Sequence, residues 1–261
     1  MRRYRIAGVV AGLVFTLGAT SSWAGIFFFS TGNPDGKIGT LSQQARPGLL
    51  ETETADDFIL TQDTSIELAT FTGLLPVGTS LSDITNVEIE VYHVFPKDSA
   101  DPPSGHVPTR VNSPADVEIG SATRDGAAES LFFFPILLNS HFTVANTVVT
   151  GIHPLPNQFT GGEGPATGEE VLFVVAFTPP IVLPADHYFF RPEVGLTEGT
   201  FLWLSAPKPI VKPGTPFSPD LQSWTRNSAL KPDWLRIGTD ITHQGPFNAA
   251  FSLIGFSVPH R

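Results

Sequence analysis

The chain lacks cysteine altogether and is poor in methionine, tyrosine and basic residues. Its 261 residues include no Cys, one Met and three Tyr, with 15 Lys and Arg against 25 Asp and Glu. Without thiols, disulfides, thiolate zinc sites, iron–sulfur sites and thiol nucleophiles are all excluded. The formal net charge of −10 disfavours binding to a nucleic-acid backbone or an anionic membrane surface. We therefore expect no nucleic-acid partner.

Long apolar runs are also lacking, except near the N-terminus. Three Arg among the first five residues precede an uncharged apolar run over 6–19, and Ser22-Trp23-Ala24 follows with small residues on both sides of Trp23. This order predicts a signal peptide, residues 1–24, that is cleaved after Ala24. An uncleaved anchor is the alternative, but the run is shorter than the ~20 residues that span a bilayer. We expect a secreted or periplasmic protein with no membrane span after cleavage.

Short apolar runs separated by turn residues fill the rest of the chain, which contains 24 Pro and 24 Gly. The stretch Glu51–Gly73 predicts two strands that meet at a turn. Asn86–Phe95 alternates most clearly, with Val87, Ile89 and Val91 on one face. Period-two alternation of this kind is typical of strands with one buried face.

Two further runs are apolar on both faces. These are Leu131–Leu138, with a bulge expected at Pro135, and Val171–Phe177. We expect both to be central strands covered on both sides. A short helix is expected only at Asp220–Asn227. The pattern predicts one all-β domain over 25–261, an antiparallel, jelly-roll-like β-sandwich with long Pro/Gly-rich loops.

Six segments together resemble a group of uncharacterised exported bacterial β-sandwich proteins. The segments are ETADDFIL (53–60), VPTRVNSPADVE (107–118), TGGEGPATGEEV (160–171), LPADHYFF (183–190), FLWLSAPKPI (201–210) and DWLRIGTDI (233–241). They span nearly the whole mature chain. The resemblance implies export and a β-sandwich fold, and it assigns no site residue.

The first candidate site is the acidic strand start. Glu53 and Asp57 share one face by the period of two, whereas Asp56 shares the other with core residues. A carboxylate beside apolar side chains must be paired or hydrogen-bonded. Structural calcium held by Glu53, Asp56 and Asp57 is one solution. An arginine such as Arg191 or Arg236, or the backbone N–H groups of the turn at 61–64, would serve equally.

A second acidic pattern, Glu88-Ile-Glu90-Val-Tyr92, superficially resembles the alternating carboxylates of jelly-roll glycosidases. Such enzymes need two carboxylates at a defined separation, and Tyr92 stands where a third carboxylate would be. We expect a solvated outer face here. Of the other catalytic patterns, Ser205-Ala-Pro-Lys208 cannot form the helical turn that a Ser–Lys pair needs, because Pro207 breaks it.

The remaining candidates are aromatic. Trp224 and Trp234 lie in a polar C-terminal stretch with Arg226 and Arg236 nearby. Indole planes beside hydrogen-bonding groups suit sugar rings; the alternative is that both cover an edge of the sandwich. The sequence predicts a non-catalytic exported β-sandwich, structural or binding a glycan or cell-surface component. The alternative is an extracellular polysaccharide hydrolase or lyase on a jelly-roll scaffold.

Overall fold

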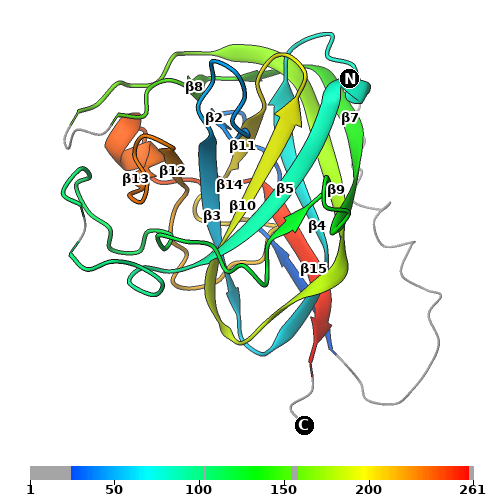
Figure 1. The fold of residues 1–261 in the computed structure, drawn as a ribbon. Coiled ribbons are helices and arrows are strands. Elements are labelled where there is room, and N and C mark those ends of the chain that lie inside the picture. Colours follow the sequence, from blue (N-terminus) through cyan, green and yellow to red (C-terminus); the bar gives the residue numbers. More distant parts are fainter. Residues whose placement is uncertain (1–24, 103, 154–157, 259–261) are drawn as a thin grey trace.

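The chain forms a β-sandwich, which confirms the fold class expected from the sequence. A computed structural model describes residues 25–102, 104–153 and 158–258; the predicted signal peptide lies outside these residues. Within them, nine strands form one sheet and six form the other, and most neighbouring strands are antiparallel (Figure 1). No helix in these ranges is long and apolar enough to cross a bilayer.

The nine-stranded sheet joins strands from both ends of the chain. Its main path is β1-β15-β4-β11-β2-β8, with β14 on β11 and the β7–β9 pair on the other edge of β4. Its strands are β1 (Ile26–Ser30), β2 (Ile38–Leu41), β4 (Thr64–Leu75), β7 (Leu131–Val144), β8 (Asn146–Val148), β9 (Ala166–Leu183), β11 (Leu202–Ala206), β14 (Asn248–Ala249) and β15 (Phe251–Ser257).

The six-stranded sheet has the order β13-β12-β3-β10-β5-β6. Its strands are β3 (Thr52–Leu60), β5 (Ile84–His93), β6 (Arg124–Asp125), β10 (Asp186–Leu196), β12 (Trp224–Asn227) and β13 (Leu235–Arg236). Two short helical turns, η2 (Leu81–Asp83) and η3 (Ile237–Ile241), complete the regular structure of the described residues. The two strands predicted within 51–73 are β3 and β4, which belong to different sheets, so the turn between them carries the chain across the sandwich.

Aromatic side chains from both sheets fill the space between them. Phe190 of β10 stacks on Phe251 of β15 with ring centroids 5.0 Å apart and planes 7° apart. Phe71 of β4 stacks on Phe173 of β9 at 4.8 Å. Trp203 is buried there as well. Along each strand, residues that point into this core alternate with residues that point outward. The two sheets differ in the kind of side chain that their outward residues carry.

The two runs expected to be covered on both sides are not. In β7, the side chains of Phe132 and Phe134 are 63% and 67% exposed. β7 pairs only with β9 among the described residues, so it lies at the edge of its sheet and not at the centre. In β9, Val171, Phe173, Val175 and Phe177 are buried, whereas the residues between them are only half-buried. The irregularities in β7 lie beyond Leu137 and not at Pro135.

The helix expected at 220–227 is also wrong. Residues 224–227 form strand β12, which pairs with β3 along four residues from Trp224–Ala55 to Asn227–Thr52. The edge of β3 offered unpaired backbone groups, and pairing with it outweighs the weak local preference of an i,i+3 apolar pair for helix. The strand brings the C-terminal stretch against the outer face of the six-stranded sheet.

Candidate functional site

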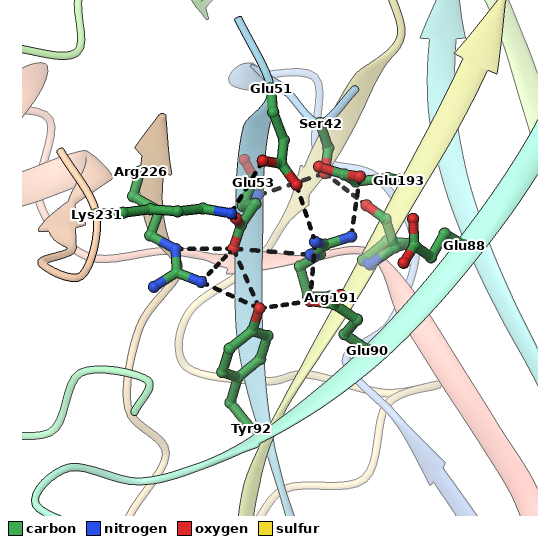
Figure 2. Close-up of polar contacts among 12 residues, drawn as sticks. Ser42, Glu51, Glu53, Glu88, Glu90, Tyr92, Arg191, Glu193, Arg226 and Lys231 are labelled. Carbon is green, nitrogen blue, oxygen red and sulfur yellow. Dashed lines mark hydrogen bonds and ion pairs between the residues drawn. The ribbon is translucent and has the colours of Figure 1, made fainter. Parts of the chain in front are cut away.

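Charged side chains on that outer face form a network, which we call the buried charge network. Its members come from β3, β5, β10, β12 and the segments that flank them. They are Glu51, Glu53, Glu90, Tyr92, Arg191, Glu193, Arg226 and Lys231 (Figure 2). Four carboxylates thus face three cations and a phenol.

Glu53 lies at the centre of the network. Arg226 donates to its Oε2 through Nε at 2.8 Å, and Lys231 Nζ lies 2.6 Å from its Oε1. On the other side, Arg191 Nε lies 3.8 Å from Oε2. Burial alone would raise the pKa of Glu53, but the charges of Arg191, Arg226 and Lys231 outweigh it and lower the pKa to about 2. Glu53 is therefore ionised throughout the physiological range.

Arg191 holds two further carboxylates. Its Nη1 lies 3.0 Å from Glu193 Oε2, and its Nη2 lies 2.8 Å from Glu90 Oε2. Burial raises the pKa of Glu193 to about 8; the attraction of Arg191 opposes this, whereas Glu53 and other nearby carboxylates reinforce it. A protonated Glu193 would leave as many carboxylates as cations. Proton uptake thus removes the excess negative charge that burial makes costly.

Tyr92 joins the two halves of the network. Its hydroxyl lies 3.2 Å from Glu53 Oε2, contacts Glu90 Oε2, and accepts a hydrogen bond from Arg226 Nη2 at 3.1 Å. Glu90 and Tyr92 are both buried, so the solvated outer face expected for the Glu88–Tyr92 stretch is wrong. The C-terminal stretch, placed by β12, covers these residues.

The predicted calcium ligands do not converge. Whereas Glu53 belongs to the network, Asp56 accepts from Ser223 Oγ and from the Ala249 N–H. Asp57 accepts from the Leu221 N–H and contacts His187 Nε2 at 2.7 Å. In the described ranges, no three His, Cys, Asp or Glu side chains are grouped so as to hold a metal ion. The arrangement favours the alternative, in which protein groups satisfy these carboxylates.

The four predicted ligand-binding residues separate into two places. Trp224, Trp234 and Arg226 are each at most 2% exposed. The Trp234 N–H donates to the Ala115 carbonyl at 3.1 Å. Neither indole offers a free face to a sugar ring. A sugar could stack on them only if the C-terminal stretch moved away from the outer face of the six-stranded sheet. Arg236 alone lies at an open pocket.

That pocket has a volume of about 440 Å³. Arg236 and Asp240 form one wall through a two-point ion pair, with Nη2–Oδ1 at 2.6 Å and Nε–Oδ2 at 3.0 Å. Phe159 and His243 form another, with ring centroids 3.7 Å apart. The ring of Phe159 is half exposed. The pocket thus offers an aromatic surface beside polar groups, as ligand sites commonly do.

A single π-helical turn, η3, builds the polar wall. The Thr242 N–H donates to the Ile237 carbonyl at 3.0 Å, and the buried side chains of Ile237 and Ile241 anchor the turn in a satellite apolar cluster. A Cβ at Gly238 would lie 1.9 Å from the Gly245 carbonyl oxygen, so only glycine fits there. Such turns often occur at functional sites.

Sequence reasoning missed most of this pocket. Asp240 could have been found from its spacing of four residues after Arg236, which suits a pair on one helical turn. Phe159 and His243 lie far apart in the sequence, in loops without periodicity, so no local signal joins them. For the network, the sequence did offer a signal. Arg191 and Glu193 are two residues apart, as are Glu88 and Glu90, so each pair lies on one face of its strand.

Protein-family models, curated proteins and solved structures give no match, so the assignment of function rests on the chain's own residues.

Proposed function

We propose that this chain is an exported, non-catalytic β-sandwich protein that binds a glycan or other cell-surface component in the pocket beside Arg236. The observation that carries the proposal is the pocket itself. It is large enough for one or two sugar rings by the usual size of small-molecule sites, roughly 300–1,000 Å³. The export half of the proposal rests on the N-terminal residues 1–24.

The lining chemistry supports a sugar. The exposed ring of Phe159 offers an apolar face for the C–H side of a pyranose. The Thr239 hydroxyl and the Arg236–Asp240 pair stand beside it with donors and acceptors for hydroxyl groups. A neutral or weakly charged glycan fits best, because the ion pair already satisfies most of the charge of Arg236.

The rival function, polysaccharide cleavage, is favoured by one observation in the network. The pKa of Glu53 is lowered to about 2 and that of Glu193 is raised to about 8. Carboxylates whose pKa values are pushed apart are typical of acid and base pairs in glycosidases. Both side chains are buried, however, and Arg191 contacts both of them. A substrate would have to displace this guanidinium.

Two measurements on protein recovered from the exported fraction test the proposal. Retention of the protein in gels containing each of a panel of soluble polysaccharides measures binding, and we expect retardation by at least one of them. Release of reducing ends from the same panel measures cleavage, and we expect none. Cleavage that disappears in Glu193→Gln would establish the rival function. No retardation by any member would reject the glycan.

A further inference from the structure

The outer face of the nine-stranded sheet carries an uncovered apolar surface. One row of side chains crosses five neighbouring strands, as the pairing register shows: Phe132, Ala176, Leu68, Ile254 and Phe28. The two ends of the row, Phe132 and Phe28, are 63% and 52% exposed. The face lies on β7, β9, β4, β15 and β1, and β7 and β9 are well separated from β12 and β13 in Figure 1.

The neighbouring rows extend this surface, which we call the outer apolar face. On one side lie Phe134 and Val174, followed by Thr70, Ser252 and Ser30. On the other side lie Val182, Ser65, Phe256 and Ile26. Phe134, Val182 and Ile26 are each at least 60% exposed. Soluble monomers rarely expose contiguous apolar patches beyond a few hundred Å².

The three rows contain no Asp, Glu, Lys or Arg, although the chain has a formal net charge of −10. Glu67, at the irregularity of β4 between Ser65 and Leu68, places one half-buried carboxylate beside the rows, where it accepts from Ser65 Oγ at 2.9 Å. The rows themselves carry no charge that would repel a second copy. A membrane surface is the poorer match, because faces that lie on lipid are usually bordered by Lys or Arg, and the rows provide none. β7 contains no Asp, Glu, Lys or Arg in its 14 positions, although charge is the common protection of an edge strand.

The area of the outer apolar face agrees with a second copy of the chain as the partner. Five strands spaced ~4.8 Å apart and three rows spaced ~6.7 Å apart give on the order of 500 Å² per copy, hence roughly 1,000 Å² for two. That is the lower end of the range of specific interfaces, so a second copy would associate weakly and reversibly.

We propose that the outer apolar face is the interface of a symmetric dimer in which two copies pack their nine-stranded sheets face to face. Phe132, Phe134 and Phe28 of each copy interdigitate with those of the other, as inner residues do between the sheets of one sandwich. Pro135 has no N–H and keeps the neighbouring edge of β7 from pairing with further strands. The pocket beside Arg236 remains open in both copies.

The test is the mass of the protein in solution, by sedimentation equilibrium over a wide concentration range, after export of the full chain. The wild type should change from monomer to dimer as concentration rises. The variant Phe132→Glu/Phe134→Glu should remain monomeric, with a dissociation constant at least tenfold higher. Val77→Glu, in an exposed turn off this face, is the matched control and should dimerise as the wild type does.

The variant Phe28→Ser distinguishes a dimer packed through the outer apolar face from a dimer paired through the edge of β7. Phe28 lies four strands away from β7, so the variant should weaken the face-to-face dimer. An unchanged dimer would indicate pairing through the edge of β7 and would overturn the proposal. A wild type that is monomeric at every concentration would overturn it too. Sedimentation with phosphatidylcholine vesicles that depends on Phe132 and Phe134 would then assign the face to a lipid surface.

Discussion

The guanidinium of Arg226 lies 4.2 Å from the centroid of the Trp234 ring. The same guanidinium donates to Glu53 at 2.8 Å, so the indole covers one face of a buried ion pair. Cation–π contacts of this kind are worth about 2 kcal/mol when both groups are shielded from water. Two residues that the sequence suggested for ligand binding therefore bind one another. Their contact shields the charge network from water and leaves neither residue free to bind a ligand.

Replacing Glu53 with Gln should destabilise the fold strongly. The change leaves Arg191, Arg226 and Lys231 without their shared carboxylate, and breaking a buried pair in this way costs about 3–5 kcal/mol. Urea unfolding measures the free energy, with the exposed Glu198→Gln as control. Because the folded pKa of Glu53 is lowered from 4.5 to about 2, the difference between variant and wild type should shrink as pH falls toward 2.

The free energy of unfolding should also depend on Glu193, at higher pH than for Glu53. Its folded pKa is raised from 4.5 to about 8, so the folded state holds a proton that the unfolded chain has lost. This contribution is complete below pH 4.5 and is lost as pH rises through about 8, with a slope of up to about 1.4 kcal/mol per pH unit.

Glu193→Gln keeps the side chain neutral at every pH and should remove that slope. Unfolding free energies measured at intervals between pH 4.5 and 8 test this, again against Glu198→Gln. Equal pH dependence in the wild type and Glu193→Gln would show that Glu193 is ionised in the folded protein, and the charge balance argued for the network would be wrong.

Calcium should leave the stability unchanged. The carboxylates of Asp56 and Asp57 accept from Ser223, Ala249 and Leu221 at 2.9–3.0 Å. Asp57 Oδ1 is the one oxygen of the pair that is buried without a hydrogen-bond partner, and one oxygen is too few to hold an ion that takes six to eight. A site occupied at a hundredfold excess over its dissociation constant would add about 2.7 kcal/mol. Melting curves in calcium and in chelator should therefore coincide, and a rise of several degrees in calcium would restore the metal site predicted from the sequence.

Tryptophan fluorescence should report a protected environment. Trp203, Trp224 and Trp234 are each at most 1% exposed, so iodide should quench them weakly, and unfolding in urea should increase the quenching several-fold. Strong quenching of the folded protein would mean that the cover over the six-stranded sheet opens in solution. The indoles of Trp224 and Trp234 would then be available to a ligand after all.

The sequence predicts strands correctly where apolar and polar residues alternate. It does not predict which strands pair with one another or which faces are covered. Period two placed β3 and β5, because the core selects apolar residues at every second position. It could not say that one face of β7 is exposed, since an apolar run looks the same whether or not something covers it. Nor could it place Trp234 on Arg226, because the pairing of β12 with β13 brings those residues together and no local pattern predicts it.

The most direct test of the proposed function is the dissociation constant of whichever glycan retards the protein, measured by calorimetry for the wild type and Phe159→Ala. A ring stacked on Phe159 contributes on the order of 1 kcal/mol by analogy with aromatic pairs, so the variant should bind about fivefold more weakly or worse. Leu50→Ala, an exposed apolar residue outside the pocket, is the control and should bind as the wild type does. Unchanged affinity in Phe159→Ala would contradict the pocket as the binding site.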